Sequence, residues 1–278
     1  MSTTGGNTAA DQLREALAKP MFNAVLKTWV GAGTTDYEVY VRTGELLSLQ
    51  TEIGQLTDPD ELMFQIVHQA QEVWLKLLSH ELAGVVGELD RDALWEASAR
   101  LDRVIRIAEC LAGELRVLET MTPDTYQVIR RSLGNGSGQE SPGYNAVLTA
   151  ADQVAAALDR LLDRRGIRVV DVYAQWAVPP HDLKRVCELL VEFDERFQLW
   201  LVGHFMMVRR TIGIGHGVNA LDGVPTRVLT GRMTKPLFRS LWQLRDELTA
   251  GWRREGGYAP GAARKAHAGC TGTSSSQG

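Results

Sequence analysis

Helical periodicity is the feature that most limits the folds open to this chain of 278 residues. Five long segments carry apolar residues at spacings of three and four, and alternating strand-like runs are nearly absent. A proline at position 59 marks one helix start, because proline favours the first helical turn. The expected fold class is therefore all-α, with four or five long antiparallel helices in one bundle. The predicted helices span about residues 59–89, 92–119, 143–164, 180–211 and 235–255.

Composition indicates one domain between two tails. A hydrophobic content of 44% is ample for a buried core in a chain of this length. Residues 1–20 and 256–278 are rich in Gly, Ser, Ala and Thr, which predicts a mobile N-terminal tail and a disordered C-terminal tail. We expect a single helical domain over residues 21–255.

Charge and cysteine usage exclude several classes of partner and site. The formal net charge of −4 shows no basic excess, so we expect no nucleic-acid partner and no anionic membrane surface. The chain has no apolar run of the roughly 20 residues that a membrane helix needs, and its first residues do not resemble a signal peptide. We expect a cytoplasmic protein. Cys110, Cys187 and Cys270 are too scattered for a disulfide framework or a structural zinc site.

Two histidines stand on the apolar faces of two predicted helices. His204 shares a face with Trp200 and Val208, and His68 shares one with Phe64 and neighbouring apolar residues. A single histidine in such a place is most often a core residue hydrogen-bonded to a carbonyl. A pair of them on two long helices instead indicates a cofactor held between the helices.

The residue pattern narrows the kind of cofactor. A carboxylate-bridged di-iron bundle needs two Glu-x-x-His pairs, which the sequence lacks. A zinc hydrolase needs a His-Glu-x-x-His run, and His80-Glu81 is followed by no second histidine. A haem iron needs one well-placed imidazole and an open opposite face. His204 and His68 can supply one ligand and one partner on the other side.

A third element contains an arginine suited to carboxylates. Tyr126 and Arg130 lie four residues apart on a predicted short helix. A guanidinium group there can hold a carboxylate through two parallel hydrogen bonds, although a surface arginine beside a tyrosine would give the same spacing. Glycine-rich interruptions at 133–143 and 213–225 each follow a motif-bearing helix, and neither matches a nucleotide phosphate loop.

In this order and with these spacings, the motifs resemble the tryptophan 2,3-dioxygenase family over roughly residues 37–248. The matching runs are Tyr37 to Tyr40 with Glu45 to Gln50, Phe64 to Gln69 with Trp74 to Leu77 and His80 to Leu82, Val117 to Pro123, Tyr126 to Arg130, Gly136 to Ser141, and Trp200 to His204 with Met207 to Gly213.

The resemblance implies a helical homotetramer that opens the indole ring of L-tryptophan with dioxygen, giving N-formylkynurenine. Its cofactor would be haem b, iron protoporphyrin IX. A homodimer is the alternative to the homotetramer. By position, His204 matches the proximal iron ligand, His68 the distal histidine that bonds the indole N–H, and Phe64 an apolar wall. The remaining matches are Arg130 as the carboxylate-binding arginine, Tyr126 and Ser141 near it, and Tyr37 and Tyr40 as tyrosines that reach a neighbouring subunit's pocket.

Two departures from the family pattern bear on substrate and outcome. The family loop Gly-Thr-Gly-Gly-Ser-Ser-Gly is replaced by residues 215–223, which lack the threonine that helps to hold the substrate amino group. Gln139 and Glu140 stand where the family has an aromatic residue and its neighbour. These changes point towards a paralogue with altered substrate or altered product.

We therefore expect a haem-dependent oxygenase acting at the indole C2–C3 bond of L-tryptophan or a substituted tryptophan. One alternative is a monooxygenase that makes a hydroxylated or oxindole amino acid in specialised metabolism. Others are a haem or tryptophan sensor without turnover and a haem-free helical interaction protein.

Overall fold

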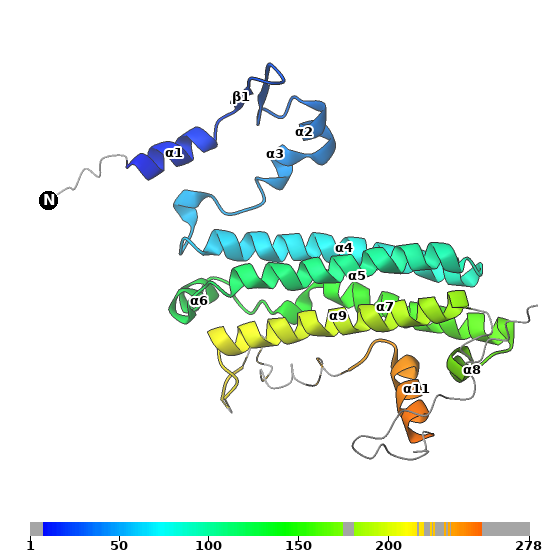
Figure 1. Cartoon of the computed structure of the whole chain (residues 1–278). Coiled ribbons are helices and arrows are strands. Elements are labelled where there is room, and N and C mark those ends of the chain that lie inside the picture. The colour runs from blue at the N-terminus through cyan, green and yellow to red at the C-terminus, as the bar shows by residue number, and fades with distance from the viewer. Residues whose placement is uncertain are drawn as a thin grey trace, which may run out of the picture.

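Four long helices lie side by side in a computed structural model of the chain, which confirms the all-α prediction (Figure 1). The structure describes residues 8–174, 181–215, 217–219, 223, 225, 231, 233 and 235–251. The four helices are α4 (Glu61–Asp90), α5 (Leu94–Leu118), α7 (Pro142–Arg165) and α9 (His181–Thr211). Helix α4 packs against α5 and α7, and α5 packs against α9. Each lies within about two residues of a predicted range.

Local sequence sets the ends of these helices. The α4–α5 turn passes through Asp92 in the left-handed region, with φ of 60°. Helix α7 begins with Pro142 after Ser141, whose side chain accepts a hydrogen bond from the Tyr144 amide, and ends at Gly166 with φ of 64°. These caps fix where each helix enters the bundle.

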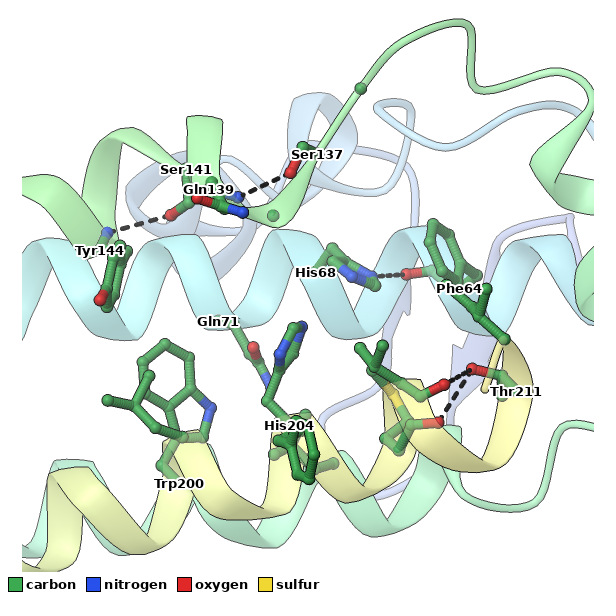
Figure 2. A pocket seen from close by; sticks show the side chains of 18 of the residues that line it. Phe64, His68, Gln71, Ser137, Gln139, Ser141, Tyr144, Trp200, His204 and Thr211 are labelled. Carbon is green, nitrogen blue, oxygen red and sulfur yellow. Dashed lines mark hydrogen bonds between the residues drawn. The ribbon is translucent and has the colours of Figure 1, made fainter. Parts of the chain in front are cut away.

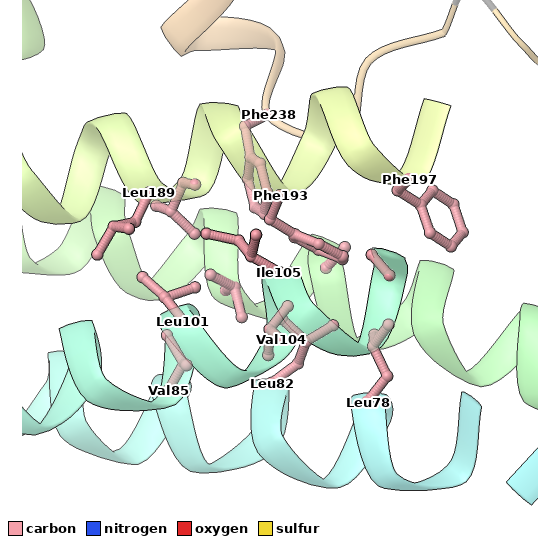
Figure 3. Close-up of a cluster of buried hydrophobic side chains, with 14 of the residues drawn as sticks. Leu78, Leu82, Val85, Leu101, Val104, Ile105, Leu189, Phe193, Phe197 and Phe238 are labelled. Atoms are coloured by element: carbon pink, nitrogen blue, oxygen red, sulfur yellow. The ribbon is translucent and has the colours of Figure 1, made fainter. Parts of the chain in front are cut away.

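Apolar stripes from the long helices form one continuous core (Figure 3). Its centre is fully buried, and each large side chain there contributes about 1.5–3 kcal/mol through burial. The core includes Leu78, Leu82, Val85, Leu101, Val104, Ile105, Phe193 and Phe197. This packing makes the bundle a firm support for side chains that face its open end.

Shorter elements flank the bundle. Helix α6 (Pro123–Arg130) and the 3₁₀ turn η2 (Gly138–Glu140) connect α5 to α7, and α8 (Val169–Ala174) follows α7. Helix α11 (Arg239–Ala250) packs on α8 and α9. The sequence predicts this last helix from residue 235, but it starts at Arg239. The amides of Leu237 and Phe238 instead donate to the buried Asp194 carboxylate on α9.

An N-terminal arm precedes the bundle and lies beyond α4 in Figure 1. We use this name for residues 8–56. It contains α1 (Ala9–Leu17), strands β1 (Met21–Asn23) and β2 (Thr28–Val30), which pair antiparallel, helices α2 (Asp36–Val41) and α3 (Thr43–Leu46), and the 3₁₀ turn η1 (Ile53–Gln55). Helix α1 lies within the predicted tail and has a complete capping box at Thr8, while none of its residues is buried.

The described part of the chain contains no helix long and apolar enough to cross a membrane. The C-terminal end of the arm is hydrogen-bonded to α4, where Gln65 and Gln69 bond to Thr51, Leu49 and Gln50. Most of its large apolar side chains are exposed, among them Met21, Phe22, Val25, Trp29, Tyr37, Tyr40, Leu47 and Leu49.

Candidate functional site

One cavity opens between α4 and α9 at the end of the bundle near α6 (Figure 2). Its volume, counted out to the solvent at its mouth, is about 1400 Å³. The apolar lining includes Phe64, Leu75, Leu115, Met121, Leu201, Phe205, Met207, Val208 and Ile212. The polar lining consists of His68, Gln71, Glu72, Tyr126, Ser137, Gln139, Ser141, Tyr144, Trp200, His204 and Thr211. The structure thus brings both predicted histidines to one space.

His68 projects from α4 with one ring nitrogen already bonded. Its Nδ1 atom lies 2.7 Å from the carbonyl oxygen of Phe64, one turn earlier. Because a carbonyl only accepts, Nδ1 carries the proton, and Nε2 of the neutral ring is left as an acceptor. Burial lowers the pKa of His68, while the Phe64 carbonyl and the charge of Glu72 oppose that shift. His68 is therefore a neutral hydrogen-bond acceptor at neutral pH.

His204 projects from α9 towards α4 (Figure 2). Burial, together with the nearby His68, lowers the pKa of His204 to about 4, so its imidazole is neutral at neutral pH. Within the described part of the chain, neither ring nitrogen of His204 has a hydrogen-bond partner. A neutral imidazole of this kind is a suitable metal ligand.

Gly138 in η2 lies against the His204 ring. A Cβ atom built on Gly138 would lie 3.7 Å from His204 Nε2 and 3.9 Å from its Cε1. No group of three or more His, Cys, Asp or Glu side chains suited to a metal ion occurs among the described residues. The single neutral imidazole of His204 at this cavity fits a cofactor that needs one protein ligand and brings its own remaining ligands, as haem does.

Aromatic rings form the wall beside His68. The centroid of the Phe64 ring lies 4.2 Å from that of His68 and 6.2 Å from that of Tyr126. Burial raises the pKa of Tyr126, so its hydroxyl keeps its proton. The structure places both Phe64 and Tyr126 in the lining of this cavity.

Ser141 reaches the cavity through a contact that the sequence analysis did not anticipate. Its hydroxyl donates to the carboxylate of Glu72, and the same carboxylate accepts from the Gly143 amide at 3.0 Å. Glu72 lies four residues after His68, on the same face of the helix. This i, i+4 spacing is the sequence feature from which Glu72 could have been predicted to lie at the site. This contact holds the wall formed by η2 and the start of α7 against α4.

Arg130 lies beside the cavity rather than in its lining. Its Nη2 atom donates to the carbonyl oxygen of Asn219 at 2.9 Å. With Gln127, Ile212 and Asn219, the arginine lines a second, open hollow that shares Ile212 with the cavity. The structure thus places Arg130 at the mouth, in contact with the glycine-rich loop after α9.

Tyr37 and Tyr40 do not line the cavity of their own chain. Both are on α2 in the N-terminal arm, with exposed fractions of 70% and 90%. This placement leaves both side chains available to another molecule. Gln71, Tyr144 and Trp200 are polar lining residues that the sequence analysis gave no role.

Comparisons with known proteins identify relatives of this chain. The family model described as tryptophan 2,3-dioxygenase matches residues 24–150. The tryptophan 2,3-dioxygenase of Myxococcus xanthus is 32% identical over 267 aligned positions, covering 78% of this chain and 91% of the relative. That of Saccharopolyspora erythraea is 32% identical over 76% of this chain and 92% of its own, and that of Erythrobacter litoralis 32% over 76% and 98%. The chain belongs to the tryptophan 2,3-dioxygenase family of enzymes.

Proposed function

We propose that this protein uses dioxygen to open the indole ring of L-tryptophan, or of a substituted tryptophan, at the C2–C3 bond. The observation that carries the proposal is the pair of neutral imidazoles, His68 and His204, that face one largely apolar cavity from opposite helices. The activity named for the relatives supports the same reaction class.

The proposed cofactor is haem b, held through its iron by His204. When bound, haem supplies the activation of dioxygen, which side chains alone do not provide. His204 suits the role because it is neutral and has no competing hydrogen bond within the described residues. The largely apolar lining of the cavity, with a few polar groups, suits a flat apolar macrocycle and an aromatic amino acid.

His68 is proposed to orient the substrate ring. Its free Nε2 atom would accept a hydrogen bond from the indole N–H, since Nδ1 is engaged by the Phe64 carbonyl. Phe64 and Tyr126 would flank the flat ring and keep water away from it. Orientation of this kind lowers the barrier by holding reactants in a productive geometry.

Arg130 is proposed to bind the substrate carboxylate at the mouth of the cavity, with Tyr126 and Ser141 nearby. Only its Nη2 atom is used by Asn219, so the other guanidinium donors can bond to a carboxylate. An amino acid held by Arg130 and His68 would lie with its side chain inward and its carboxylate at the opening.

Assembly is part of the proposal. Tyr37 and Tyr40 would enter the cavity of a neighbouring subunit, within a homotetramer or a homodimer. Their exposure, and that of the apolar side chains around them in the N-terminal arm, supports this role. Residues 21–255 would then form one haem-binding oxygenase domain, with its arm shared between subunits.

A second candidate is a monooxygenase that gives a hydroxylated or oxindole amino acid. Two observations favour it: Gln139 lines the cavity where the family has an aromatic residue, and Arg130 bonds to a loop without the family threonine. Such a reaction would need an external reductant, because only one oxygen atom enters the product. A sensor that binds haem or tryptophan without turnover would show no product.

A matched pair of histidine variants tests the proposed function. His204→Ala should abolish uptake of haem, seen as loss of the Soret band, and should abolish turnover of L-tryptophan. His80→Ala is the control, since His80 lies on the exposed side of α4 and should leave both readouts unchanged. A His204→Ala protein that keeps the parent spectrum and activity would refute the assignment.

A further inference from the structure

The indole nitrogen of Trp200 is a buried hydrogen-bond donor without an acceptor. Trp200 lies on α9, lines the cavity and is only 6% exposed. Its Nε1 atom has no hydrogen-bond partner in the structure. A buried donor of this kind costs free energy, because it has lost its bond to water and gained nothing in return.

The other described tryptophans are either hydrogen-bonded where they are partly buried or exposed to water. Trp74 donates to Glu114 and Trp242 donates to Asp194, each at 2.8 Å. Trp29 and Trp95 are 57% and 80% exposed, so water can reach them. Among the tryptophans that the structure describes, Trp200 alone is both buried and unpaired.

Packing holds the Trp200 ring against the cavity. The ring centroid of Phe197 lies 5.3 Å away and that of Tyr144 lies 6.2 Å away. In Figure 2 the nitrogen of the indole is on the side that faces His204, one helical turn further along α9. The indole ring is therefore fixed in place, with its N–H group buried on the side of His204.

The chemistry of the indole N–H limits which kind of ligand atom it can bind. An indole N–H donates one hydrogen bond and accepts none, so it selects an acceptor and rejects a cation. No lysine or arginine lines the cavity among the described residues, so an anionic oxygen there depends on neutral donors such as the Trp200 N–H. A bond from a neutral N–H to a carboxylate is stronger than one to a neutral acceptor.

We propose that Trp200 donates its Nε1–H to a carboxylate oxygen of the molecule bound in the cavity. This inference rests on the proposed function, in which two carboxylate sources enter the cavity: a haem propionate and the carboxylate of the amino acid. Trp200 is one turn from His204, whereas Arg130 lies at the mouth. The position of Trp200 favours a haem propionate as the acceptor. The carboxylate of the amino acid is the alternative acceptor that the test must distinguish.

The sharpest variant removes the N–H and keeps the shape. Site-specific replacement of Trp200 by β-(3-benzothienyl)alanine exchanges the N–H for sulfur, and Trp200→Phe is the genetic counterpart. The matched control is the same replacement at Trp242, whose N–H is already bonded to Asp194. Three quantities are measured for each protein: the urea midpoint of the haem-free chain, haem affinity by Soret titration, and affinity for L-tryptophan and tryptamine.

The two positions should respond in opposite ways. Loss of the Trp200 N–H should leave the urea midpoint unchanged or raised, because an unpaired donor is removed, while ligand affinity falls about tenfold or more. Loss of the Trp242 N–H should lower the midpoint and leave ligand affinity unchanged, because the protein itself uses that bond.

The binding arms distinguish the two sources. Weaker haem uptake with unchanged L-tryptophan affinity assigns the bond to a propionate. Weaker binding of L-tryptophan but not tryptamine, with unchanged haem uptake, assigns it to the amino acid. Unchanged affinity for both would overturn the inference. A parent chain that takes up no haem would instead refute the proposed cofactor, and L-tryptophan binding would then decide the role of Trp200 alone.

Discussion

The Nδ1 atom of His68 bonds to the carbonyl oxygen of Phe64 one turn earlier on α4, at 2.7 Å. This bond fixes the ring orientation and the tautomer, and it directs the unprotonated Nε2 atom away from the backbone. Sequence patterns of this type are usually read as a core histidine bonded to a carbonyl. Here the same bond prepares the second nitrogen for a ligand.

The pH dependence of turnover should reflect a neutral His68. Its pKa lies below the usual value of about 6.5, so kcat/KM for L-tryptophan should stay level at neutral pH and fall only in more acidic solution. Glu72→Gln should move this acidic limb to lower pH, because the Glu72 charge raises the His68 pKa. A limb centred at or above pH 6.5 in the parent would show that His68 is not the group observed.

The haem-free chain should become less stable as the pH falls, because His204 takes up a proton more readily in the unfolded chain than in the folded one. The folded pKa of about 4 lies below the unfolded value, so the unfolded chain binds more protons between about pH 6.5 and pH 4. The parent should therefore lose about 3 kcal/mol on acidification through this range, of which about 2 kcal/mol falls between pH 7 and pH 5. In urea titrations at pH 7 and pH 5, His204→Leu should show a smaller loss than the parent. Equal losses in both proteins would contradict the burial of a neutral His204.

Glu72 should matter for the cavity wall as well as for stability. Glu72→Ala leaves the Ser141 hydroxyl and the Gly143 amide without their acceptor, which should cost about 1–3 kcal/mol. Glu72→Gln keeps one acceptor oxygen and should cost less. Thermal or urea unfolding measures the effect, with Glu195→Ala on the exposed side of α9 as the control. A Glu72→Ala protein as stable as the control would show that the contacts of Glu72 with Ser141 and Gly143 do not stabilise the fold.

Arg130 should act on the carboxylate of the substrate. Arg130→Leu should raise KM for L-tryptophan by a factor that corresponds to about 1.5–3 kcal/mol, the worth of a hydrogen bond to a charged group. Binding of tryptamine, which has no carboxylate, should change little. Arg131→Leu is the neighbouring exposed control. An unchanged KM for L-tryptophan would show that the bond to Asn219 is the whole role of Arg130.

The long helices could be predicted from sequence because burial of an apolar stripe repeats along each of them. The start of α11 could not, since it depends on Asp194, a residue more than forty positions earlier that takes the amides of Leu237 and Phe238. The same limit applies to the N-terminal arm. The loop after its short hairpin is held by Glu38, which accepts hydrogen bonds from the Gly31, Thr34 and Thr35 amides, and no long apolar period marks this contact in the sequence.

The site shows a similar division. His68, Phe64 and His204 were predictable because helical spacing places them on inward faces, and the structure brings them to one cavity. The Glu72 contact and the unpaired Trp200 N–H required knowledge of which helices pack together. The bond from Arg130 to Asn219 joins elements that no local pattern links.

The mass of the product formed from L-tryptophan and isotopically labelled dioxygen tests the central claim most directly. Haem-loaded, reduced protein should give a ring-opened product that carries two labelled oxygen atoms. A product with a single labelled oxygen would contradict dioxygenation and establish the monooxygenase in its place. A protein that binds haem through His204 and forms no labelled product from L-tryptophan or ring-substituted tryptophans would contradict the enzymatic assignment altogether.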